Sequence, residues 1–280
     1  MASNSEFIPV ENEGWLQGYR NLSRRELASW WKTRSWLTQA LIWIAIIDGM
    51  LAMVLLMVPE IDKAQQKDAT PSGEQQAAQD ENLGLMMFFT MMGMAPAVGA
   101  VIAGQEAILD EKIKGTAGWL LSKPVSRSAF ILSKITPNAL GMLVTMAVLP
   151  GIVGYFIFLV AGHPVSILGF SAGILAAFLS LFFYLTFTIF LSTVSNSRGL
   201  AIGLPMGMIF GYQLFLGLVP GLANYTHWGL TVAVGSGSTP LAMALAQEQW
   251  NANFMPVVCT VLLILVFSFL AVRRFEKEEL

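Results

Sequence analysis

Charged residues are scarce in this sequence of 280 residues: Asp, Glu, Lys and Arg make up only 12% of it. A soluble domain usually carries about a quarter charged residues, so the composition predicts an integral membrane protein. The formal net charge of -2 gives no sign of the basic surface that nucleic acid requires. The single cysteine, Cys259, lies in an apolar run, so no intramolecular disulfide can form.

The sequence also lacks familiar catalytic motifs. It contains no phosphate-binding G-x-x-x-x-G-K-[ST] loop and no H-E-x-x-H metal motif. We therefore expect that the chain does not hydrolyse ATP and is not itself an enzyme. Inverted repeats, which mark many secondary transporters, are not seen either.

The sequence contains long apolar runs: 55% of the residues are hydrophobic and the mean hydropathy is +0.62. Each of six runs is near or above the ~20 residues that cross a bilayer core of about 30 Å. These runs are Trp36–Val58, Leu83–Gly104, Pro137–Val160, Ile167–Thr193, Ala201–Leu222 and Met255–Val272. Because unpaired backbone groups are not tolerated in lipid, the runs should be helices. The predicted fold class is an all-α integral membrane protein with six transmembrane helices.

The basic residues predict the orientation in the membrane. Of the 16 Lys and Arg residues, 14 fall in the N-terminal segment, the second-to-third connection, the fourth-to-fifth connection and the C-terminal tail. The opposite side holds only Lys63 and Lys67. By the positive-inside rule, both termini and residues 105–134 are expected in the cytoplasm of a multi-pass cell-membrane protein.

The chain divides into four predicted segments. Residues 1–14 form a flexible cytoplasmic lead, 36–272 the transmembrane domain and 273–280 a cytoplasmic tail. Between the first two, residues 15–35 alternate aromatic and basic side chains. This pattern favours a helix lying at the membrane interface, and a helix packed on its own protein is the alternative.

Two further segments are expected on the outer side. Pro59–Asn82 is polar and acidic. In the last outer segment, Pro240 favours a short helix that runs toward Gln249 at the outer surface. His163 and His227 also fall outside the predicted spans and are too isolated in sequence to indicate a site.

A polar island, Gln105–Lys134, separates the second and third spans. Glu106–Lys114 favours helix, with Asp110 placed to pair with Lys114 at i,i+4, and Gly115 is a plausible C-cap. Thr116 can then cap a second, short helix that carries Trp119, Leu120 and Leu121 and ends before Pro124. Ser126 or Ser128 can cap the long helix that follows. An exposed Trp-Leu-Leu patch needs a partner surface.

The run E-K-x-x-G-T-x-x-W-L-L-S-K-P-V-S-R resembles the first cytoplasmic loop of ABC type-2 exporter permeases, where a short coupling helix docks on a separate ATPase subunit. Residues 15–35 are similar to the interfacial (elbow) helix of the same family. The alternative is an ordinary solvated loop. The matching residues are Glu111, Lys112, Gly115, Thr116, Leu120, Leu121, Pro124, Val125, Ser126, Arg127 and Lys134.

The resemblance implies the permease subunit of an ATP-driven exporter, working as a dimer with two copies of an ABC ATP-binding subunit. ATP and Mg would be bound by that partner, and no cofactor or metal by this chain. Two other classes stay open: a secondary transporter or channel, and a membrane-embedded enzyme. The ATPase-coupling residues implied are Glu111, Lys112, Gly115, Thr116, Trp119, Leu120, Leu121, Pro124 and Arg127.

Asp48 is the only acid or base well inside a predicted span. Such a carboxylate is costly in a membrane and is a candidate functional residue, although it can also serve to hold the helix bundle together. Glycine and proline interrupt the second and fifth spans, where close helix packing is favoured over a hinge for the substrate path. The many methionines of the first three spans favour an adaptable apolar lining over a copper(I) path.

Overall fold

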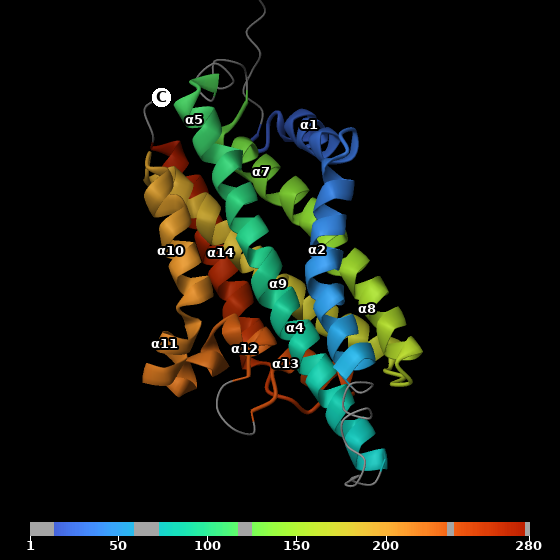
Figure 1. Ribbon diagram of the computed structural model, residues 1–280. Helices are drawn as coiled ribbons and strands as arrows, with labels where there is room; N and C mark the ends of the chain where they lie inside the picture. The colour runs from blue at the N-terminus through green and yellow to red at the C-terminus, as the bar shows by residue number, and fades with distance from the viewer. Residues whose placement is uncertain (1–13, 59–72, 117–124, 234–237, 278–280) are drawn as a thin grey trace, which may run out of the picture.

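The computed structural model describes residues 14–58, 73–116, 125–233 and 238–277. Within these residues all regular secondary structure is helical (Figure 1). Helices satisfy their own backbone hydrogen bonds, as a chain with this composition requires in lipid. The all-α prediction is confirmed.

Five helical stretches are long and apolar enough to cross a membrane. They are Ser35–Met57, Ala78–Ile113, Arg127–Val160, Ile167–Val194 and Met255–Glu276. Three of them contain a π-helical turn: η1 ends the first stretch, and η2 and η3 each join two α-helices. In chain order the elements are α2 (Ser35–Ala52), η1 (Met53–Met57), α4 (Gly73–Gln105), η2 (Glu106–Asp110), α5 (Glu111–Ile113), α7 (Arg127–Met142), η3 (Leu143–Val148), α8 (Leu149–Val160), α9 (Ile167–Val194) and α14 (Met255–Glu276).

The fifth expected span is not straight. Helices α10 (Arg198–Phe210) and α11 (Tyr212–Leu218) meet at an angle of 60°, so the run is one bent span or a re-entrant pair. The bend falls at Gly211, whose backbone leaves the helical region while its N–H still reaches the Gly207 carbonyl over 2.8 Å. The prediction of one continuous helix over Ala201–Leu222 is therefore wrong, because the helix breaks at Gly211.

The chain after the bend folds back into the bundle. A 3₁₀ turn η4 (Pro220–Tyr225) leads to α12 (Trp228–Thr231) and then α13 (Leu241–Ala246). The helix expected after Pro240 is therefore present as α13. The prediction that it lies at the outer surface is wrong, because every residue of α13 is buried. Glycines of α9 allow this close approach, since a Cβ at Gly173 would lie 2.6 Å from the Ala242 carbonyl oxygen.

Helix α9 lies at the centre of the bundle. Of its most apolar stretch 72% is buried, against 22% for α14. It is apolar around its whole circumference, as expected of a helix with neighbours on every side. Helices α4, α14, α13 and α10 all pack against it.

Helix α7 begins at Arg127, ten residues before the expected start of the third span at Pro137. Ser126, one of the two serines predicted as candidates, is its N-cap, and its Oγ accepts a hydrogen bond from the N–H of Ala129 at 3.1 Å. Pro137 lies inside the helix instead of starting it. The additional turns extend α7 beyond the apolar run and provide a surface for the N-terminal helix.

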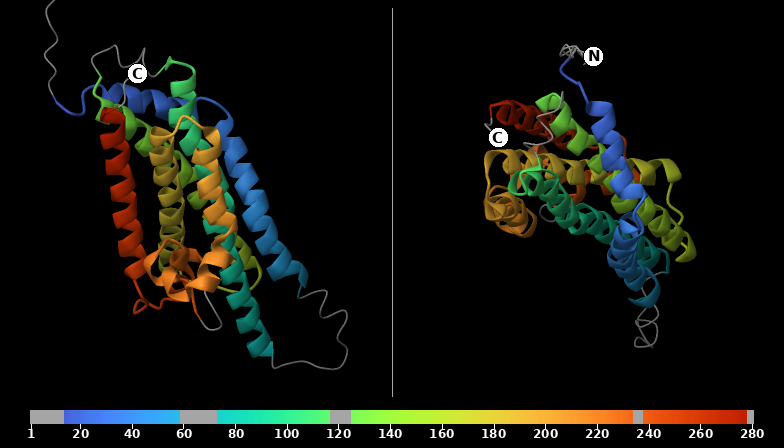
Figure 2. Two further views of the ribbon diagram at one scale, coloured as in Figure 1. Left: turned by 90° about the vertical axis from the view of Figure 1, so that its left-hand side faces the viewer. Right: turned by 90° about the horizontal axis from the view of Figure 1, so that it is seen from above.

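That N-terminal helix, α1 (Tyr19–Trp31), runs across the end of the bundle and packs along α7 (Figures 1 and 2). The Trp30 indole N–H donates to Asn138 Oδ1 over 2.9 Å. Its ring lies against Gly141, where a Cβ would be 2.4 Å away. The amphipathic helix therefore packs on its own protein, and its position at the membrane interface stays a prediction.

Helix α1, α5 and the last turn of α14 lie at the same end of the bundle (Figure 1). We refer to this end as the terminal end.

Candidate functional site

The second long stretch ends in the polar island. Its α-helix continues into the π-helical turn η2 and ends with the short helix α5. Turns of the π type within helices are often found at functional sites. The predicted pair is present, with Lys114 Nζ 3.1 Å from Asp110 Oδ2. Gly115 adopts φ +68°, the left-handed conformation of a helix C-cap, and its N–H bonds the Lys112 carbonyl at 3.1 Å.

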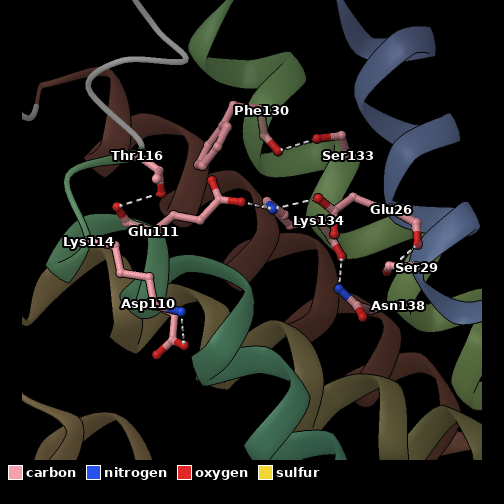
Figure 3. A network of polar contacts seen from close by, with 10 residues as sticks. All are labelled: Glu26, Ser29, Asp110, Glu111, Lys114, Thr116, Phe130, Ser133, Lys134 and Asn138. Atoms are coloured by element: carbon pink, nitrogen blue, oxygen red, sulfur yellow. Dashed lines mark hydrogen bonds and ion pairs between the residues drawn. The ribbon is translucent and has the colours of Figure 1, made fainter. Parts of the chain in front are cut away.

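Lys134 is the centre of an ionic cluster that joins three elements (Figure 3). Its Nζ lies 2.7 Å from Glu26 Oε1 of α1 and 2.5 Å from Glu111 Oε1 of α5. The lysine side chain, on α7, is only 5% exposed, so its charge depends on these two carboxylates. Removing one partner of a buried pair is strongly destabilising, and the cluster therefore ties α1, α5 and α7 together.

Asp110 makes a second ionic contact, toward α10. Its Oδ1 lies 2.6 Å from a guanidinium nitrogen of Arg198, the first residue of α10. Lys112 donates to the Ser192 carbonyl of α9 over 3.3 Å. The cations Arg198 and Lys114 are more than half exposed, so these contacts add little stability. These contacts position α5 and η2 beside α9 and α10 but contribute little to the stability of the fold.

Arg127, at the other end of the polar island, binds the end of α14. Its Nη1 donates to the carbonyls of Glu276 at 2.7 Å and Phe275 at 3.3 Å. A cation is favourable there because a helix C-terminus carries partial negative charge. The rings of Phe130 and Phe275 stack at 5.0 Å beneath this contact.

The start of α7 also holds the residues before α1. Both Ser126 Oγ and Ser128 Oγ donate to the Trp15 carbonyl, and the N–H of Ser126 donates to Gln17 at 3.1 Å. Gly18 has φ +82° and lies against Val125, whose Cγ2 would be 2.9 Å from an added Cβ. The flanks of the island are thus attached to α1, α10 and α14.

The structure places some of the predicted coupling residues and not others. Lys112 contacts α9, and Thr116 Oγ1 donates to the Glu111 carbonyl over 3.2 Å. Trp119, Leu120, Leu121 and Pro124 lie outside the described residues, so the predicted coupling helix stays a prediction.

Sequence reasoning missed Glu26 and Arg198 as partners. Glu26 lies among basic residues of α1, and its partner Lys134 is 108 positions away in the chain. The one available signal was Lys134 itself, a cation in a strongly apolar helix that requires an anion nearby.

Asp48 is not part of the ionic cluster. It lies on α2, 2% exposed, and neither carboxylate oxygen has a hydrogen-bond partner in the described part of the chain. Its Oδ1 would be 3.0 Å from a Cβ at Gly154. Gly154 and Lys134 are 20 residues apart on the same helical stretch, roughly 30 Å by helical rise.

His227 was also missed as a buried residue. It is 2% exposed, stacks on the ring of Phe183 at a centroid distance of 4.1 Å and shares a 2.8 Å hydrogen bond with the Tyr184 hydroxyl. The sequence placed it outside the spans, and only the return of the chain after Gly211 brings it against α9. It therefore holds the segment after the bend against α9.

The fold and the polar terminal end define the class: a helical polytopic membrane protein whose second and third long stretches meet other helices through ionic and polar contacts at the terminal end. A family model described as ABC-2 family transporter protein matches residues 23–280, and the chain belongs to that family. It is therefore a membrane component of an ABC transporter, whose general partner is an ABC ATP-binding component. No curated protein matches the chain.

Proposed function

We propose that the chain is the permease subunit of an ATP-driven exporter in the cell membrane, with its terminal end in the cytoplasm. A second permease copy and two ATP-binding subunits complete the assembly. ATP and Mg bind the ATP-binding subunits, and this chain binds neither. The family and the concentration of 14 of the 16 basic residues on the side of the termini support this orientation.

The observation that carries the proposal is the attachment of the polar island at both flanks. A displacement of the predicted coupling helix reaches α5 through Gly115 and α7 through Ser126. Glu111 and Lys134 pass it to α1, Asp110 passes it to α10, and Arg127 passes it to α14. Contiguous packed and hydrogen-bonded elements are a physical means of coupling distant sites.

The apolar patch of the coupling helix is the proposed docking surface. Buried aromatic and leucine anchors commonly carry such interfaces, and truncating one costs about 2 kcal/mol or more. We expect Trp119→Ala combined with Leu120→Ala to weaken the hold on the ATP-binding subunit and to reduce the ATPase activity of the complex. Co-purification in mild detergent and phosphate release measure the two effects.

A matched truncation at the opposite end serves as the control. Trp250 and Phe254 are 48% and 42% exposed, and their replacement by Ala removes similar apolar surface. This control should retain the ATP-binding subunit. Full retention by the Trp119→Ala, Leu120→Ala protein, with unchanged ATPase activity, would show that the polar island is only a linker.

A further inference from the structure

A cavity of about 630 Å³ lies beside the ionic cluster, between α1, α2, the α4–α5 stretch and α7. Its volume is within the roughly 300–1,000 Å³ range of small-molecule sites. One end is formed by the charged residues of the terminal end and the other by apolar side chains deeper in the bundle, among them Trp43, Val98 and Met146. The cavity is therefore amphipathic along its length.

The polar end carries more negative than positive charge. Four carboxylates line it (Glu26, Glu106, Asp110 and Glu111) against the ammonium groups of Lys114 and Lys134. Both lysines are already engaged by Asp110 and by the Glu26–Glu111 pair. Glu106 is exposed, and among the described residues no cation lies within ion-pair distance of it. A ligand cation would find this carboxylate available.

The apolar end is held in place before any ligand arrives. The Trp43 indole N–H donates to Gln39 Oε1 at 3.0 Å, and its ring lies against Gly99, where a Cβ would be only 2.6 Å away. Trp30, also in the lining, is fixed by Asn138. Two oriented indoles beside a cluster of carboxylates favour a cation with a large apolar body.

The cavity opens on the side of the bundle. Ile42 of α2 and Ile102 of α4 both line it, and each is 44% exposed. In a membrane-spanning chain an exposed isoleucine on a long helix faces lipid or another apolar surface. An amphiphile can therefore reach the cavity laterally, from the membrane leaflet at the terminal end.

We propose that this cavity binds a lipophilic cation, with its charge at Glu106 and its apolar body against Trp43. The idea that such a cation is the exported substrate rests on the proposed function. The idea that the cavity binds such a cation rests on the cavity alone. The test therefore uses the purified full-length chain, without an ATP-binding subunit or transport.

The probe is radiolabelled tetraphenylphosphonium, measured by equilibrium binding to the chain in phosphatidylcholine nanodiscs, with empty nanodiscs subtracted. Tetraphenylborate has a similar size and shape but the opposite charge. We expect saturable binding of the cation and none of the anion. Equal saturable binding of both ions would overturn the charge assignment and with it the proposal.

Two variants locate the site. Glu106→Gln keeps the size of an exposed side chain and should weaken tetraphenylphosphonium binding at least about threefold, the size of a partly screened charge contact. Ala103→Phe fills the cavity from α4 and should abolish saturable binding. Glu81→Gln, at the other end of the same helix, should leave binding unchanged. Wild-type binding in both Glu106→Gln and Ala103→Phe would place the probe elsewhere and refute the proposal.

The same cationic chemistry can come from a free amphiphile or from the amino headgroup of a phospholipid. Adding phosphatidylethanolamine to the nanodiscs separates these sources. Competition with the probe identifies the aminophospholipid as an occupant of the site, and unchanged affinity identifies the free cation. Both results presuppose saturable binding at Glu106 and therefore support the site.

Discussion

Lys134 is a buried cation whose charge is shared by two carboxylates from distant parts of the chain. Pairs of this kind gain little net stability, because desolvation offsets their attraction, but they are costly to break. Their value lies in specifying which elements meet. Here the lysine, on α7, brings α1 and α5 together through one ammonium group.

Replacing Lys134 by Met should therefore be destabilising. Glu26 and Glu111 would face each other without a cation, and the expected loss is about 3 kcal/mol. Thermal unfolding in detergent, followed by thiol-dye labelling of Cys259, measures this change. The triple variant that adds Glu26→Gln and Glu111→Gln should recover most of the stability. If the triple variant recovered no stability, the effect of Lys134 would not come from pairing with these two carboxylates.

Asp48 presents the opposite case, a buried carboxylate for which the described residues offer no donor. A polar group buried without a partner is unfavourable, so a purely structural role would leave it poorly explained. We expect Asp48→Asn to leave expression and thermal stability near wild type and to lower the ATPase activity of the assembled transporter. A large fall in stability with normal specific activity would instead assign Asp48 to packing.

Among the elements, the contact of α1 with α7 depends on the absence of a side chain at Gly141. The Trp30 ring occupies the space where a Cβ would stand, and the indole N–H is bound to Asn138 one turn away. Some other helix glycines have open space at that position. Gly203, for example, has no atom within 4 Å of its Cβ position.

Gly141→Ala should displace Trp30 and loosen α1, whereas Gly203→Ala should be neutral or slightly stabilising, since alanine favours helix by about 1 kcal/mol over glycine. Trypsin cleavage at the exposed Arg24 and Arg25 reports the loosening. We expect faster cleavage in Gly141→Ala alone. Equal rates in both variants would mean that Trp30 does not hold α1.

At the scale of the whole molecule, the bundle has two unlike ends. The terminal end carries the ionic cluster, and the opposite end carries the loops that precede α13 and α14. If the terminal end is cytoplasmic, a membrane-impermeant thiol reagent on intact cells should reach only the opposite end.

In a Cys259→Ser background, Asn251→Cys should be labelled and Ile113→Cys should not. Both positions are exposed, so accessibility in the folded chain does not bias the comparison. Permeabilised cells should label both. Labelling of Ile113→Cys alone in intact cells would invert the proposed orientation.

The sequence by itself determined the fold class, the family resemblance and the local structure at the two flanks of the polar island. Hydropathy, capping residues and i,i+4 pairs act over a few neighbouring positions, so Ser126, Gly115 and the Asp110–Lys114 pair could be predicted. Only the tertiary structure decided that Lys134 meets Glu26, that α13 is buried and that a cavity lies beside Trp43. Those features depend on how helices far apart in the chain pack, and on bends such as that at Gly211, which no local pattern specifies.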